Sequence, residues 1–148
     1  MSRAFVKETA NAAPPPERMV TEGPNPVTEA GHAQIVAEVA RLEAALGVES
    51  NVLLRETLER DLRYWAVRKA SAEVQPPPAG DVAAFGAKVT FTRAGRRQTY
   101  RIVGEDEADP AKGLLNVRSP LAAALLGAGP GDIVDFQGGE LEVTAVES

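Results

Sequence analysis

The stretch Gln75-Pro76-Pro77-Pro78-Ala79-Gly80 divides the chain into two parts whose apolar residues follow different periods. Consecutive prolines remove backbone donors and cannot continue a helix, so they end the preceding element and space the next domain semi-rigidly. Before them, apolar residues recur every three or four positions, which is the period of an amphipathic helix. After them, apolar and polar residues alternate, which is typical of a strand. The switch predicts an α+β chain with a linker at 75–81.

The part before the linker predicts two helices. Thr28 is a favourable N-cap, and Glu29 places a carboxylate in the first turn, where the helix dipole favours it. The apolar stripes consist of Ile35, Val39, Leu42 and Leu46 in the first helix and of Leu54, Leu58, Leu62 and Trp65 in the second, which is expected from about Val52 to Ser71. Because only a few residues connect them, we expect an antiparallel helical hairpin, a short coiled coil, over 27–74. Glu49, Ser50 and Asn51 would form its tip.

The part after the linker, residues 82–148, predicts a sheet domain. Strands are expected at 88–92 and 98–103 around an Ala94-Gly95 turn, at 114–117, and at 132–136 and 140–146 across Gly138-Gly139. Pro120 is favoured at the first helical position and Gly127 after the last, which predicts one short helix between them. The domain is therefore expected to be an antiparallel sheet with one short helix lying on it.

Residues 1–26 are rich in proline and are expected to be a flexible tail. An alternative interpretation makes Phe5 and Val6 the anchors of a short docking peptide. The start of the chain lacks the apolar stretch of a secretory signal, and no apolar run reaches the roughly 18 residues that span a membrane. We therefore expect a cytoplasmic protein.

The composition narrows the classes of function. A net charge of −5 argues against binding nucleic acid by neutralising phosphates, and suits a basic protein surface instead. The absence of cysteine excludes thiolate chemistry, and a single histidine leaves little for a multi-histidine metal site or a catalytic triad. No metal and no cofactor are expected. The acidic residues Glu105, Asp106, Glu107 and Asp109 match no calcium loop, and an exposed loop face accounts for them.

Two motifs in the C-terminal part carry a family resemblance. They are Thr99-Tyr100-Arg101-Ile102-Val103-Gly104-Glu105-Asp106-Glu107-Ala108-Asp109, and the segment from Asn116 to Gly127 followed by Gly131-Asp132. Both resemble the C-terminal domain of the GreA/GreB transcript cleavage factors, and the likeness extends over residues 82–146. It implies an FKBP-like fold without implying prolyl isomerase activity.

The resemblance implies that the partner is a bacterial RNA polymerase and indicates which residues would contact it. In Gre factors the helical hairpin enters the secondary channel of the polymerase, and an acidic tip motif helps to hold a second magnesium ion there. Ser119-Pro120-Leu121 lies where these factors grip the rim of the channel, and Arg118 stands where GreB-like sequences carry an acid. Ser119 and Pro120 are also a normal cap and first residue of a helix, and both roles are compatible.

The hairpin of this chain is short and carries one acid at its tip, Glu49. Its first helix of about 21 residues is roughly 32 Å long by the helical rise, about 18 Å less than the family's arm. These proportions are similar to those of Rnk, a relative that does not stimulate cleavage. We therefore expect a monomeric, non-enzymatic regulator that binds the polymerase at the secondary channel, with nucleic acid contacted at most indirectly.

Two alternatives stay open at this point. The chain could be a true cleavage factor that uses Glu49 with Asp61 or Glu56 at the magnesium ion. It could also be an FKBP-like prolyl isomerase, for which Phe85, Phe91, Tyr100 and Phe136 are the aromatic residues available in the domain.

Overall fold

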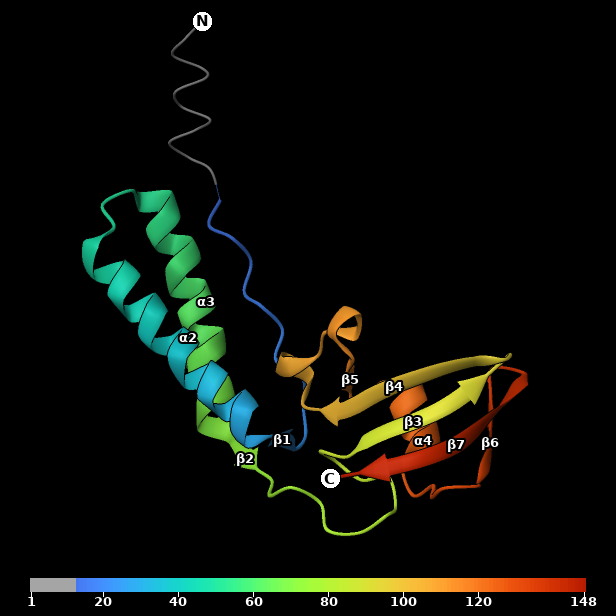
Figure 1. Cartoon of the computed structure of the whole chain (residues 1–148). Helices are drawn as coiled ribbons and strands as arrows, with labels where there is room; N and C mark the ends of the chain where they lie inside the picture. Colours follow the sequence, from blue (N-terminus) through green and yellow to red (C-terminus); the bar gives the residue numbers. More distant parts are fainter. Residues whose placement is uncertain (1–12) are drawn as a thin grey trace, which may run out of the picture.

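The computed structural model describes residues 13–148, and the expectations for residues 1–12, including Phe5 and Val6, lie outside the described residues. Figure 1 shows a helical hairpin and a sheet domain joined by an extended linker. This arrangement confirms the α+β class with an N-terminal hairpin and a C-terminal sheet that carries a short helix. No helix among residues 13–148 is both long enough and apolar enough to cross a membrane.

The hairpin consists of α2 (Glu29–Val48) and α3 (Val52–Ser71), each of 20 residues. Both helices begin at a side-chain cap that satisfies a backbone donor otherwise left without an intrahelical partner. The amide of Gly31 donates to Thr28 Oγ1 at 3.0 Å, and the amide of Leu54 donates to Asn51 Oδ1 at 3.1 Å. The predicted helix starts are confirmed.

The apolar stripe of α2 packs against α3 along most of the hairpin. Ile35, Val39 and Leu42 are buried, and burial of side chains of this size stabilises the fold by about 1.5–3 kcal/mol each. The stripe of α3 is less well covered, and Leu54 at its start is 53% exposed. A hairpin of two helices has no third layer, so apolar residues near its tip stay in contact with water.

A short parallel pair of strands at the base of the hairpin is absent from the sequence-based prediction. β1 (Asn25–Val27) pairs with β2 (Ala72–Val74). Residues 25 and 26 thus lie in a strand, although the sequence placed them in the tail. The Asn25 side-chain amide donates to the carbonyl of Arg68 at 3.0 Å, and Val27 is 1% exposed, so the strand is anchored by contacts that only the folded hairpin provides.

The sheet domain has five strands in the order β5-β4-β3-β7-β6. Their bounds are β3 Lys88–Arg93, β4 Arg96–Val103, β5 Leu114–Asn116, β6 Ile133–Phe136 and β7 Gly139–Glu147. The sheet is mixed rather than wholly antiparallel, because β5 runs parallel to β4. The last turn is Gln137-Gly138, one residue earlier than predicted, and both residues have the positive φ that a tight hairpin turn requires.

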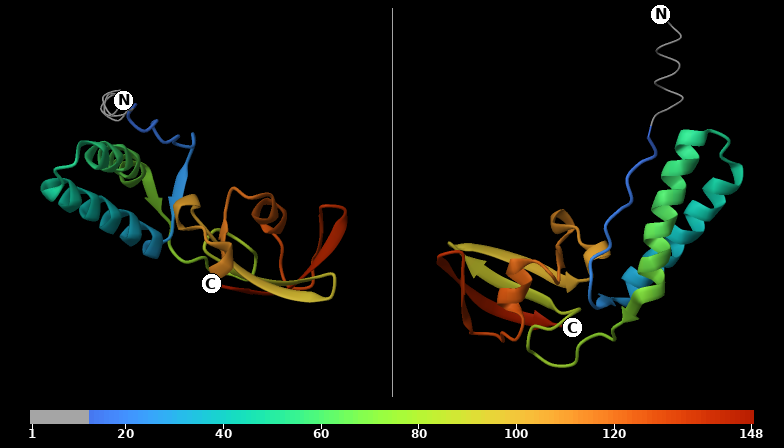
Figure 2. Two further views of the ribbon diagram at one scale, coloured as in Figure 1. Left: turned by 90° about the horizontal axis from the view of Figure 1, so that it is seen from above. Right: turned by 180° about the vertical axis from the view of Figure 1, so that it is seen from behind.

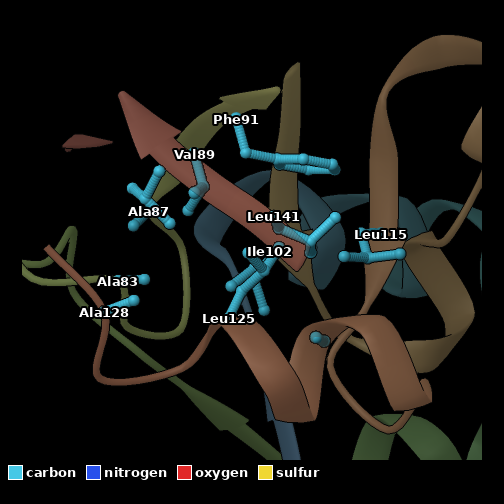
Figure 3. Packing of buried hydrophobic residues seen from close by; sticks show 11 residues of the cluster. Ala83, Ala87, Val89, Phe91, Ile102, Leu115, Leu125, Ala128 and Leu141 are labelled. Atoms are coloured by element: carbon cyan, nitrogen blue, oxygen red, sulfur yellow. The ribbon is translucent and has the colours of Figure 1, made fainter. Parts of the chain in front are cut away.

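The short helix α4 (Pro120–Leu125) covers one face of this sheet (Figures 2 and 3). Its Ala122 and Leu125 join the core formed by Val89, Phe91, Ile102, Leu115, Leu141 and Val143. Side chains alternate along a strand, so the residues on either side of Ile102 in β4, Arg101 and Val103, belong to the opposite face. Val103 is nevertheless 1% exposed. The pocket that it helps to line is also lined by residues from the start of α2, so the base of the hairpin lies over this second face.

Candidate functional site

The corner at the start of α4 has the geometry of a capped helix on an exposed turn. The amide of Ala122 donates to Ser119 Oγ at 3.2 Å, and Pro120 occupies the first helical turn. Pro120 is exposed and Leu121 is half-buried against the core. The three predicted contact residues Ser119, Pro120 and Leu121 therefore lie together, and the outer side of this corner is accessible to a partner.

Arg118, the fourth residue predicted for this contact, faces the N-terminal segment. Its Nη2 donates to the carbonyls of Pro24 at 2.7 Å and Glu22 at 3.3 Å. Its Nε lies 3.6 Å from Glu105 Oε1. The guanidinium thus holds the chain just before β1 against the sheet domain, a role that sequence reasoning missed.

The hairpin tip is a turn held by hydrogen bonds between its own polar groups. Arg55 Nη1 donates to the carbonyls of Leu46 and Glu49, each at 2.8 Å, and so caps the end of α2. The amide of Asn51 donates to Glu49 Oε2 at 3.1 Å. The predicted tip residues Glu49, Ser50 and Asn51 lie at this turn, with one carboxylate that already accepts a backbone hydrogen bond.

Large apolar residues flank Glu49 in the sequence of the tip. Val48 is 86% exposed and Val52 is 66% exposed, and Leu53 and Leu54 are also exposed. The tip therefore exposes several large apolar side chains to water. Its surface is mainly apolar, with Glu49 as its only acid among the residues from Val48 to Leu54.

A buried charged cluster joins the hairpin to the sheet domain. Arg68 of α3 is 2% exposed, and its Nε donates to Asp106 Oδ2 at 2.6 Å. Its Nη2 donates to Glu105 Oε1 at 2.8 Å and to Asn25 Oδ1 at 2.7 Å. Tyr64, one helical turn earlier, donates its hydroxyl to Asp106 Oδ1 at 2.5 Å. We call these residues, Asn25, Tyr64, Arg68, Glu105 and Asp106, the joint.

The surroundings of the joint raise the pKa values of Tyr64 and Arg68. Burial raises the pKa of Tyr64, and the hydrogen bond to Asp106 raises it further, to about 12. Burial lowers the pKa of Arg68, but the hydrogen bond and charge of Asp106 and the charge of Glu105 outweigh it, so the pKa rises. The guanidinium therefore stays charged, and its burial is compensated by two carboxylates.

Glu107 completes the connection at the start of α2. Its Oε2 accepts from the amides of Thr28 at 3.0 Å and Gly104 at 3.1 Å, and Thr28 Oγ1 donates to its Oε1. A carboxylate at a helix N-terminus is favoured by the helix dipole. Gly31 permits this approach, because a Cβ at that position would lie 2.0 Å from the Glu107 carboxyl carbon.

The acidic run was therefore misread as an exposed loop face. Glu105–Glu107 forms the short helix η1, the Asp106 side chain is 6% exposed, and Glu107 is 8% exposed. One sequence signal could have indicated that these acids are buried. Arg68 is a basic residue near the end of α3, and acids elsewhere in the chain are available to pair with it. Within residues 13–148 no group of three or more His, Asp or Glu side chains is arranged to hold a metal ion.

The two acids considered as partners for Glu49 lie away from the tip. Asp61 accepts from Arg60 at 2.9 Å and pairs with Arg18 at 3.4 Å. It stands ten residues after Asn51, or about 15 Å along the helix by the rise per residue. Glu56 is nearer to the tip, but its Oε2 is buried without a hydrogen-bond partner in the described part of the chain.

Comparisons with known proteins agree with the resemblance found in the sequence. Residues 77–148 match the family model described as transcription elongation factor, GreA/GreB, C-terminal. The transcription elongation factor GreA of Anaeromyxobacter sp. (strain K) is 39% identical over 124 residues, which cover 74% of this chain and 73% of that protein. The chain belongs to the GreA/GreB family.

Other GreA relatives match over a shorter stretch. GreA of Alkalilimnicola ehrlichii is 51% identical over 67 residues, and this match spans only 42% of that protein. Among solved structures, the chain is similar to the GreA factor homolog 1 (Gfh1) protein of Thermus thermophilus, with 19% identity, a TM-score of 0.40 and coverage of 85% of this chain and 100% of that one. A GreA/GreB factor from Nitrosomonas europaea gives 20% identity and a TM-score of 0.41, covering 86% of this chain and 100% of that one.

The GreA/GreB match contains the corner and the acidic half of the joint. Ser119, Pro120 and Leu121 lie within residues 77–148, as do Glu105 and Asp106. The hairpin tip and Arg68 lie before residue 77, outside that match. The family match covers the sheet domain, and the longer alignment with the Anaeromyxobacter GreA covers 74% of the chain.

Proposed function

We propose that this chain is an RNA polymerase-binding regulator that docks at the secondary channel through the corner at Ser119, Pro120 and Leu121. Its hairpin would occupy the channel without supplying the pair of carboxylates that a second magnesium ion needs. The observation that carries the proposal is the tip, where Glu49 stands alone among exposed apolar side chains and accepts the Asn51 amide at 3.1 Å.

The chemistry of magnesium supports this distinction from a cleavage factor. Mg²⁺ binds oxygen ligands at about 2.0–2.1 Å in a nearly octahedral arrangement, so two carboxylates must approach within a few ångströms of each other to share one ion. Asp61 is about 15 Å along α3 from Asn51 and is paired with Arg60. The alternative that Glu49 acts with Asp61 would require a rearrangement of the hairpin.

The corner supports the docking half of the proposal. Ser119 and Pro120 are set by the cap of α4, whose other side packs into the core through Ala122 and Leu125. A docking surface on such a rigid element loses little conformational entropy on binding. The Pro120 ring is exposed at the first position of α4, so a substitution that the helix start tolerates changes the surface more than the stability.

RNA cleavage in backtracked bacterial polymerase complexes tests the proposal directly. The full chain is titrated against a known Gre cleavage factor, and cleavage is expected to fall as the chain occupies the channel. Pro120→Glu should weaken this inhibition by about tenfold, or 1.4 kcal/mol. An acid in the first turn of a helix is tolerated, so the fold should survive.

Ala111→Glu provides the matched control, because Ala111 is exposed in the short helix η2 (Pro110–Lys112), outside α4, and receives the same charge. It should change the inhibition by less than about twofold, well below the cost of losing a hot-spot contact. Inhibition that is insensitive to Pro120→Glu would refute docking by the corner. Cleavage stimulated by the chain alone, and lost in Glu49→Gln, would instead establish the cleavage factor.

A further inference from the structure

The face of the sheet opposite α4 forms the floor of a groove that begins under the base of the hairpin and runs away from it. Thr99, Arg101 and Val103 alternate with core-facing residues of β4 and so lie in a row on this face. The four steps from Thr99 to Val103 span about 13 Å along the strand. Arg101 lies beside Leu114 of β5 in the sheet, which widens the floor by one strand.

One end of this groove is a mostly apolar pocket of about 360 Å³. The start of α2 and the linker form its walls above Arg101, Val103 and Leu114. The wall residues are Thr28, Glu29, Ala30, Gln34, Gln75, Pro76 and Pro77. Apart from Arg101 in the floor, the charged and amide side chains that line this end are those of Glu29, Gln34, Gln75 and Glu107. The Glu107 carboxylate already accepts hydrogen bonds from the amides of Thr28 and Gly104.

The other end of the groove is a basic hollow of about 220 Å³ that shares Arg101 and Leu114 with the pocket. Lys88, Arg101 and Lys112 line it together with the Thr99 hydroxyl and Gly113, and no carboxylate does. Within the described part of the chain, Lys88 and Arg101 form no ion pair. Lys112 lies 3.9 Å from Asp109 and is 79% exposed, so that pair is weak.

The convergence of these cations is unusual for a chain with a net charge of −5. Three like charges around one hollow repel each other unless an anion lies between them. Arg101 is held in place, because its Nη1 donates to the carbonyl of Gly86 at 2.7 Å. A guanidinium has five N–H donors, so the remaining ones can face a ligand.

We propose that this groove binds a nucleoside phosphate, with the phosphates in the basic hollow and the base and sugar in the pocket. The hollow and the pocket together have the size of ordinary small-molecule sites, which are mostly apolar with a few placed polar groups. The charges fix the orientation of the ligand. Lys88 and Lys112 line the hollow and not the pocket, and Arg101 lies between the two, whereas Glu29 and Gln34 at the pocket end suit hydroxyl and amine donors of a nucleoside. The groove lies apart from the corner and the tip, so this proposal is independent of polymerase docking.

Fluorescence anisotropy with methylanthraniloyl-labelled ADP and GDP tests the proposal on the full chain. At least one of the two probes should bind saturably. Lys88→Gln and Lys112→Gln should each weaken binding by about tenfold, and both side chains are exposed, so the fold should persist. Ala30→Trp, which places an indole in the pocket from an exposed position of α2, should weaken binding by a similar factor.

The control is Arg97→Gln, which also removes one positive charge. Arg97 lies two residues before Thr99, on the same face of β4 as Thr99 and Arg101, but it does not line the hollow. Arg97→Gln should alter the affinity for the probe by less than about twofold if binding depends on contacts within the hollow. A larger change would be expected if binding depended on the overall positive potential of this face of the sheet. The unlabelled nucleoside diphosphate should displace the probe at a lower concentration than either pyrophosphate or the free nucleoside.

Three results would overturn the proposal. The first is the absence of saturable binding with both probes. The second is a loss in Arg97→Gln equal to that in Lys88→Gln, which would reveal a diffuse basic surface. The third is displacement by pyrophosphate as effective as displacement by the nucleotide. That result would mean that the groove binds phosphate in the hollow and does not bind the nucleoside in the pocket.

Discussion

Replacement of Arg68 with methionine tests whether the joint holds the hairpin on the sheet domain. Methionine keeps much of the length and apolar stem of arginine but removes three hydrogen bonds, to Asp106, Glu105 and Asn25. The Asp106 side chain is 6% exposed, so its charge would be left buried without a cation. Breaking a buried pair in this way costs about 3–5 kcal/mol.

The loss should be measured by urea and thermal unfolding, followed by far-ultraviolet circular dichroism because the hairpin supplies most of the helix. At roughly 2–4 °C per kcal/mol for a chain of this size, the midpoint should fall by about 10 °C. The control is Arg63→Met on the same helix, whose pair with Glu17 is exposed and whose loss should cost less than about 1 kcal/mol.

A second variant separates the uncompensated charge from the lost packing. Adding Asp106→Leu to Arg68→Met removes the carboxylate that the first change leaves buried, so it should recover a large part of the loss. The reasoning is refuted if Arg68→Met costs no more than Arg63→Met. That result would mean that water reaches the joint and screens its charges.

The remaining predictions concern the start of α2 and the joint tyrosine. Gly31→Ala should destabilise the protein by about 1–3 kcal/mol in urea unfolding, because the new Cβ would meet the Glu107 carboxylate. The control is Gly47→Ala in the same helix, whose new Cβ meets nothing within 4 Å and which should be neutral or stabilising. Similar effects of the two changes would contradict the close approach of Glu107. Since the pKa of Tyr64 is raised to about 12 in the folded state, its contribution is complete below the unfolded value near 10 and is lost as pH rises to about 12. Unfolding midpoints measured across that window should fall less steeply in Tyr64→Phe than in the wild type, and equal slopes would argue against a buried hydroxyl.

Local sequence signals determined the elements of this protein. Thr28, the proline run from Pro76 and the alternation after Lys88 mark boundaries through properties of single residues and their neighbours. The helical hairpin and the strands of the sheet domain could therefore be predicted from sequence. The corner at Ser119 and Pro120 was found in the same way, because a helix cap is a local feature. The motif around Tyr100 also identified the family.

Only the tertiary structure decided what the charged residues do. Arg68 is separated from Glu105 by 37 residues and from Asn25 by 43, and no periodicity links positions so far apart. The parallel pairing of β1 with β2 and the hold of Arg118 on Pro24 depend on the same folding back of the chain. Whether an acid is exposed or buried beside a cation is set by the element that packs over it. The acidic run after Val103 therefore had no assignable role until the base of α3 was placed against it.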